Sequence, residues 1–305
     1  MKKLFILLLV LFCGMQASAQ VKKAKAKEPL PQKEMALQLY SIRTIFNAGN
    51  YAETHEKIFK QLKQFGYTGV EAASYKDGKF YGVTPEQYKA DLAAAGLESM
   101  SSHTSHRLSA EELSSGKFEK SMQWWKEAIK AHKAAGLKYI VTPSDHFPKS
   151  MAEAKVLCEY HNAIGKLCKE NGIKYGYHSH SFEYQKIEGT DQIWYDYFIQ
   201  NTNPDYVFFQ MDVYWCVMAQ MSPVEYYKKY PGRFTCLHIK DKYELGQSGM
   251  LGFDAIFKAY KISGMKDFVV ELERTDGSID IMEGVKRSAT YLRKSKFVKP
   301  SYRNL

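Results

Sequence analysis

The sequence has few cysteines and no long apolar run. Five of its 305 residues are cysteine, which is too few for a disulfide scaffold. The one extended apolar run, residues 4–13, is shorter than the roughly 20 residues that a membrane-spanning helix needs. We therefore expect a protein without a membrane span whose later cysteines are mostly buried thiols. With 45% hydrophobic and 25% charged residues, the composition is that of a folded domain.

Acidic residues are missing from the first 27 positions, which contain six lysines. Without this segment the chain has 37 basic and 33 acidic residues, so the net charge falls from +10 to +4. The basic character therefore belongs mainly to the N-terminal segment and gives little support for a nucleic-acid partner.

This N-terminal segment has the three parts of a secretory signal. Lys2 and Lys3 precede the apolar run, and an Ala-Ser-Ala motif ends at Ala19. We predict a signal peptide at 1–19, a disordered tether rich in lysine and proline at 20–33, and one folded domain at 34–305. The mature protein is then expected in the periplasm or outside the cell.

From residue 35 onward, short β-rich runs alternate with longer helical patterns eight times. Thr84-Pro85 and Ser222-Pro223 each combine a helix cap with a proline in the first turn, so both predict helix starts. Eight such units predict an α/β fold, a single (β/α)₈ TIM barrel. The alternative, an open doubly wound sheet, is disfavoured because no G-x-G-x-x-G turn follows the first strand. The predicted strands are 35–41, 67–72, 97–103, 137–142, 173–178, 206–212, 234–240 and 268–273.

Polar side chains collect where these predicted strands end. Six of the eight ends carry a histidine or a carboxylate, and the C-terminal ends of barrel strands meet on one rim, where active sites lie. Because strand residues alternate between two faces, one inward group from each of the last four strands can converge on one ion. Histidine and carboxylate ligands without cysteine favour a divalent cation, namely Mn²⁺, Zn²⁺, Co²⁺ or Mg²⁺.

Five segments together make the chain resemble the xylose isomerase-like TIM barrels, the sugar isomerase/epimerase superfamily. They are Gly69-Val-Glu71, Tyr177-His-Ser-His-Ser-Phe-Glu-Tyr184, Gln210-Met-Asp-Val-Tyr214, Leu237-His-Ile-Lys-Asp241 and Val269-Val-Glu271. The resemblance extends over about residues 35–292. It implies a catalytic divalent metal, most often Mn²⁺, with one ligand from each of strands five to eight.

Carried over by position, the implied metal ligands are His178, Asp212, His238 and Glu271. Strand five departs from the family pattern, because His178 stands where a glutamate is usual; Glu183 is the competing ligand. The chemistry of the neighbouring residues suggests catalytic and substrate-binding positions as well. The catalytic candidates are His180, Glu183 and Lys240, and the substrate-binding candidates are Tyr40, Glu71, His103 and Tyr214.

These residues suit proton abstraction next to a sugar carbonyl, with the metal stabilising the enolate. We expect a metal-dependent isomerase or epimerase, an enzyme that acts on a non-phosphorylated carbohydrate, since no phosphate-binding loop is visible. The alternatives are a lyase or dehydratase of 3-keto-glycosides at the same site and a non-catalytic carbohydrate-binding barrel. An abasic-site endonuclease is disfavoured by the low charge of the fold. A homo-oligomer is compatible with the sequence.

Overall fold

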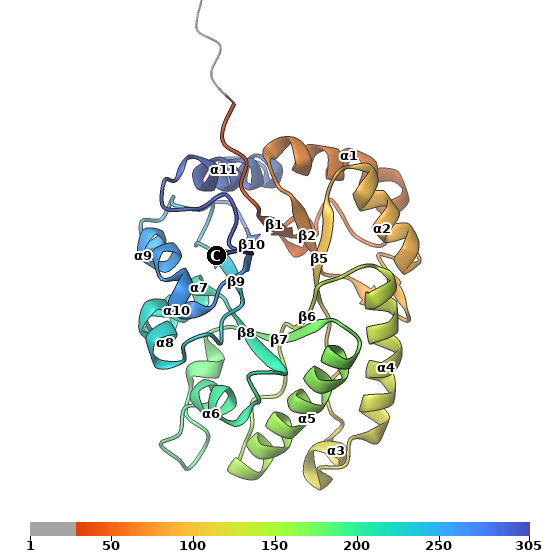
Figure 1. The fold of residues 1–305 in the computed structure, drawn as a ribbon, viewed down its shortest axis with the longest axis vertical. Coiled ribbons are helices and arrows are strands. Elements are labelled where there is room, and N and C mark those ends of the chain that lie inside the picture. The colour runs from red at the N-terminus through yellow and green to blue at the C-terminus, as the bar shows by residue number, and fades with distance from the viewer. Residues whose placement is uncertain (1–28) are drawn as a thin grey trace, which may run out of the picture.

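Eight parallel strands form the wall of a barrel, and helices surround them (Figure 1). The hydrogen-bonded order is β8-β7-β6-β5-β2-β1-β10-β9, and a parallel bridge between Asp212 and His238 joins the two outer strands. The predicted (β/α)₈ TIM barrel is therefore confirmed. The strands are β1 (Ala36–Gln38), β2 (Gly69–Ala72), β5 (Glu98–His103), β6 (Tyr139–Thr142), β7 (Lys174–Ser179), β8 (Val207–Met211), β9 (Cys236–Lys240) and β10 (Asp267–Glu271).

The computed structural model describes residues 29–305. The predicted signal peptide and the predicted tether up to residue 28 lie outside this range. The end of the predicted tether lies against the last helix, α11 (Ile281–Lys294), where Arg293 donates to the Leu30 carbonyl at 2.6 Å and Lys33 Nζ donates to the Leu292 carbonyl at 2.8 Å. Among the helices of residues 29–305, none combines the length and apolar character needed to cross a membrane.

The helices begin where side chains can cap them. Thr84 and Ser222 accept the backbone N–H three residues later, and Pro85 and Pro223 follow them, as predicted. The helices that cover the barrel are α1 (Tyr51–Phe65), α2 (Pro85–Ala94), α4 (Glu119–Ala134), α5 (Met151–Glu170), α6 (Trp194–Asn201), α8 (Pro223–Lys229), α9 (Phe253–Lys258), α10 (Tyr260–Ser263) and α11. Short helices α3 (Ala110–Ser115), η1 (Leu39–Ile42), η2 (Phe182–Tyr184) and α7 (Val213–Met218) lie in the connections.

The fold contains two apolar cores, one outside the barrel wall and one inside it. A large core lies between strands and helices, and a small inner one of Ala36, Met100, Tyr139, Val141, Phe208, Cys236 and Val269 lies among the strands. Arg303 contacts Asp267 at 2.7 Å and Glu98 at 2.8 Å beside the N-terminal ends of β5 and β10. An ion-pair group thus occupies the N-terminal ends of the strands, and the apolar inner core lies between it and the polar residues at the C-terminal ends.

The structure also departs from the predicted boundaries. The first strand ends at Gln38 rather than at residue 41, because the Gln38 side chain accepts the Tyr40 N–H and starts the short helix η1. A hairpin of β3 (Tyr75–Lys76) and β4 (Lys79–Phe80) follows β2, joined by Asp77-Gly78 with positive φ at both residues. This Asp-Gly pair is the turn that two-residue hairpins favour.

The four cysteines in the described range, Cys158, Cys168, Cys216 and Cys236, are buried and free. Burial raises the pKa of the Cys158 thiol to about 12. The prediction that these cysteines are mostly buried thiols is therefore confirmed.

Candidate active site

A cavity of about 560 Å³ opens at the C-terminal ends of the strands. Its size is within the range of small-molecule sites. The predicted residues that line it come from loops and strand ends on both sides of the barrel. The lining residues are Tyr40, Ala73, Ser74, Tyr75, His103, Thr104, Ser105, Pro143, His178, His180, Trp215, Lys240, Glu271 and Glu273.

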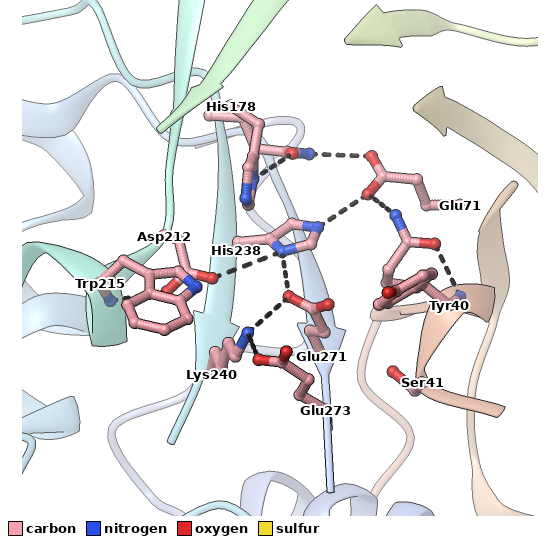
Figure 2. Close-up of polar contacts among 12 residues, drawn as sticks. Tyr40, Ser41, Glu71, His178, Asp212, Trp215, His238, Lys240, Glu271 and Glu273 are labelled. Carbon is pink, nitrogen blue, oxygen red and sulfur yellow. Dashed lines mark hydrogen bonds and ion pairs between the residues drawn. The ribbon is translucent and has the colours of Figure 1, made fainter. Parts of the chain in front are cut away.

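Asp212, His238 and Glu271 form a buried cluster at the ends of β8, β9 and β10 (Figure 2). His238 Nδ1 lies 3.3 Å from Glu271 Oε2 and 3.9 Å from Asp212 Oδ2. Asp212 Oδ1 caps α7 by accepting the Trp215 N–H at 3.0 Å. Its Oδ2 is buried and has no hydrogen-bond partner among residues 29–305. An orphaned carboxylate oxygen facing an imidazole nitrogen fits a cation ligand.

The charges around this cluster are strongly coupled. Lys240 Nζ lies 2.7 Å from Glu273 and 3.3 Å from Glu271, and these carboxylates with Asp212 raise its pKa despite burial. Burial would raise the pKa of Glu271, but the His238 hydrogen bond and the Lys240 charge hold it below its usual range. Burial, assisted by the Glu271 charge, raises the pKa of Asp212. Carboxylates outnumber the lysine, and a divalent cation would offset the excess negative charge.

A second group consists of three imidazoles, those of His103, His178 and His238. Their ring centroids are 4.5 to 5.2 Å apart. Of the four implied metal ligands, three therefore share one cluster, and His178 adjoins it through His238. Oxygen and imidazole donors of this kind fit Mn²⁺, Zn²⁺, Co²⁺ or Mg²⁺.

Glu71 lies beneath the cavity and is fully buried. We predicted it as a substrate-binding residue, but it does not line the cavity, and its oxygens accept hydrogen bonds from five side chains. Burial would raise its pKa, yet the charges and hydrogen bonds of His103 and His238 hold that pKa well below the usual range. Its donors are Gln38 at 2.7 Å, Ser101 at 2.5 Å, Gln210 at 2.9 Å, His103 at 3.0 Å and His238 at 2.7 Å.

His180 and Glu183 lie on different sides of the turn after β7. His180 lines the cavity, its ring stacked on Phe182 at 5.9 Å, and burial lowers its pKa to about 4. Glu183 is buried against Tyr177, whose hydroxyl donates to it at 2.8 Å, and it also accepts the His180 N–H at 2.8 Å. Tyr177 is on the helix-facing side of β7, in the outer core. Glu183 therefore faces away from the cavity.

The remaining predicted residues lie at the mouth of the cavity or beside it. Tyr40 is 45% exposed at the mouth, with the Arg43 guanidinium 4.1 Å from its ring centroid. Tyr214 is partly buried outside the lining, with its ring centroid 6.0 Å from Lys240 Nζ. The Trp215 ring is closer to the same lysine, at 5.0 Å, and lines the cavity.

Some residues that line the cavity were not predicted from the sequence. Tyr75 begins the hairpin that follows β2, and Ser74 directly precedes it; the Asp-Gly turn was the signal that could have located this hairpin. Thr104, Ser105 and Pro143 have no such signal. They reach the cavity only because β5 and β6 are neighbours in the barrel.

Comparison with known proteins agrees with this architecture. Residues 59–295 match the family described as "Xylose isomerase-like TIM barrel". A sugar phosphate isomerase/epimerase from Parabacteroides distasonis is 34% identical, with a TM-score of 0.78 over 91% of this chain and 99% of that one. No curated protein matches the chain.

More distant structures share the fold alone. An L-ribulose 3-epimerase is 14% identical, with a TM-score of 0.65 over 85% of this chain and 92% of that one. A 3-keto-D-glucoside 4-epimerase from E. coli is 18% identical, with a TM-score of 0.61 over 87% of this chain and all of that one.

Proposed function

The chain belongs to the xylose isomerase-like TIM barrel family, and from this membership we propose that it is a divalent-metal-dependent isomerase or epimerase of a non-phosphorylated carbohydrate. The observation that carries the proposal is the cluster of Asp212, His238 and Glu271, with its orphaned oxygen, beside a cavity of suitable size. These three residues would hold the cation, and His178 is the nearest further candidate. When bound, a divalent cation polarises a substrate carbonyl and stabilises the negative charge that develops on its oxygen.

The chain itself supplies the proton transfers. His180 is neutral at pH 7 because burial lowers its pKa, so its ring can accept the proton from the carbon next to the carbonyl. Its Nδ1 has no partner among the described residues. Lys240, held by Glu271 and Glu273, can donate to a substrate oxygen. Return of the proton to a different position or face gives the isomer or epimer.

The cavity lining supports a substrate without phosphate. Among the described residues that line it, Lys240 is the one lysine or arginine, and two carboxylates already pair with it. Glu273 is part of the same wall, so a phosphate group would meet negative charge there. The predicted export of the chain supports the same choice, since sugar phosphates are intracellular metabolites.

Elimination from a 3-keto-glycoside is the second candidate, and the position of Glu183 favours it. With this glutamate turned toward Tyr177, the strand-five side of the cavity offers imidazoles and no carboxylate base. The described lining residues therefore do not include two glutamates placed to act on opposite faces of a ketose. The same enolate can expel a leaving group from the neighbouring carbon.

Proton NMR in D₂O separates these reactions. The mature chain, loaded with Mn²⁺, is incubated with a free ketose and with a 3-keto-glucoside, in parallel with a chelator-treated sample. Chelator-sensitive deuterium incorporation with the sugar skeleton intact supports the isomerase or epimerase, whereas release of the aglycone supports elimination. Sugar binding that is unchanged after chelation, without any reaction, would instead favour a carbohydrate-binding barrel and refute the proposal.

A further inference from the structure

Two buried side chains beneath the cavity contact the three imidazoles. Glu71 and Gln210 are both fully buried and hydrogen-bonded to each other at 2.9 Å. We propose that they are positioning residues that fix the tautomers of His103 and His178, so that both rings present their unprotonated nitrogen on the side away from Glu71 and Gln210. The tautomers do not depend on the proposed function. The identity of the ligand that these nitrogens bind does rest on it.

Glu71 sets the direction of every hydrogen bond around it. The Gln38 amide oxygen already accepts the Tyr40 N–H, so its NH₂ group is the part that donates to Glu71 Oε1, and this oxygen acts as an acceptor. The imidazole nitrogens that contact the same oxygen must therefore donate as well. Since His238 Nε2 lies 2.7 Å from Glu71 Oε1, this nitrogen carries a proton, and Nδ1 is the nitrogen that faces Asp212 and Glu271.

Gln210 in turn determines which nitrogen carries the proton in His103 and in His178. Its amide nitrogen must face Glu71, so its amide oxygen is the atom that faces the imidazoles. That oxygen lies 2.9 Å from His103 Nε2 and 3.1 Å from His178 Nδ1. Because an amide oxygen only accepts, both nitrogens are protonated.

The opposite nitrogens are then free to accept. Nε2 of His178 and Nδ1 of His103 have no hydrogen-bond partner within residues 29–305, and both rings line the cavity. Together with the carboxylates, this wall consists mainly of acceptors. It suits a cation or a ligand rich in hydroxyl groups, which can donate to the bare nitrogens, and it disfavours an anionic group.

The tautomers can be read directly in the metal-free protein. Two-bond ¹⁵N–¹H correlation spectra of histidine-labelled protein distinguish Nδ1–H from Nε2–H rings without metal or substrate. We expect His178 to be Nδ1–H in the unmodified chain. A His178 ring found as Nε2–H would overturn the proposal.

Glu71→Gln gives a sharper test, because it makes a second, opposite prediction. The new NH₂ group is accommodated most easily at the former Oε2, where the Ser101 hydroxyl can rotate and the Gln210 amide can flip. The flipped amide would donate to His178 Nδ1, so we expect His178 to change to the Nε2–H form. His238 should keep its Nε2 proton, because the oxygen it contacts is retained.

Gln38→Met is the matched control. Gln38 donates to the same carboxylate at 2.7 Å but contacts none of the three imidazoles, so His178 should stay Nδ1–H. If Glu71→Gln does not fold, Gln210→Met serves instead and should leave His178 as a mixture of tautomers. A pure Nδ1–H ring in a folded Glu71→Gln or Gln210→Met variant would refute the assignment.

Metal affinity supplies the second readout. Isothermal titration with Mn²⁺ should show a loss of about 10- to 100-fold in Gln210→Met, the range for residues that orient metal ligands, and no loss in Gln38→Met. The predicted tautomers with no reaction on any sugar would leave this inference standing and refute the proposed function. An active enzyme with the opposite His178 tautomer would refute this inference and leave the proposed function standing.

Discussion

Raising the pH from about 4.5 to about 8 should remove the contribution that one buried residue, Glu183, makes to folding stability. Burial raises the pKa of this carboxyl from 4.5 to about 8, in spite of the hydrogen bonds that it accepts from Tyr177 and His180. A carboxyl whose pKa is raised by folding stabilises the native state fully below its unfolded pKa. That contribution is lost as the pH rises toward the folded pKa, so the loss falls between pH 4.5 and about 8.

The magnitude follows from the shift. One pKa unit corresponds to about 1.4 kcal/mol, so the shift predicts a loss of up to about 5 kcal/mol across this window. Glu183→Gln isolates the contribution, since glutamine imitates the protonated acid: its oxygen can accept the His180 N–H, and its NH₂ can donate to the Tyr177 oxygen. The variant should gain stability relative to the unmodified chain as the pH rises.

Urea denaturation of both proteins at a series of pH values measures the difference. Glu188→Gln is the control, because Glu188 is exposed in the same connection and should give a constant difference. A difference between Glu183→Gln and the unmodified chain that stays flat across the window would refute the reasoning. It would mean that the two hydrogen bonds hold Glu183 as a carboxylate despite its burial.

Three further predictions address the metal cluster, the proton acceptor and the closed end of the barrel. Asp212→Asn keeps an oxygen to cap α7 but removes a charge. Calorimetry should therefore show Mn²⁺ affinity lowered at least about tenfold, with little change in the melting temperature. An unchanged Mn²⁺ affinity would exclude Asp212 as a ligand. His180→Gln should slow deuterium exchange into the substrate by about 10²- to 10⁴-fold while Mn²⁺ affinity is kept, and unchanged exchange would exclude it as the base. Arg303→Met leaves the buried Asp267 without its cation, so urea denaturation should show a loss of about 2–3 kcal/mol, and a loss below about 0.5 kcal/mol would contradict this role.

Much of the architecture could be predicted because it depends on local patterns. Alternation of β-rich and helical runs determines the number of strands, and cap-proline pairs such as Thr84-Pro85 fix helix starts. The period of two along a strand decides which side chains face inward, as it does for His178 and His238. Strand ends of one parallel barrel share a rim, so the convergence of Asp212, His238 and Glu271 also followed from the sequence.

The roles within that rim were decided only by the tertiary structure. Glu183 follows the strand at a turn, and no local periodicity says whether a residue in a turn faces the cavity or the helices; its contact with Tyr177 decides this. Glu71 lies on an inward-facing position near the end of its strand, as a substrate-binding residue would. It is nevertheless buried beneath the cavity, where Gln210 from the opposite side of the barrel contacts it at 2.9 Å. Such contacts join residues 139 positions apart and depend on how the barrel closes, which no local pattern records. The sequence by itself therefore determined which residues meet at the rim, and the closed barrel decided which of them line the cavity, which are buried beneath it and which face away.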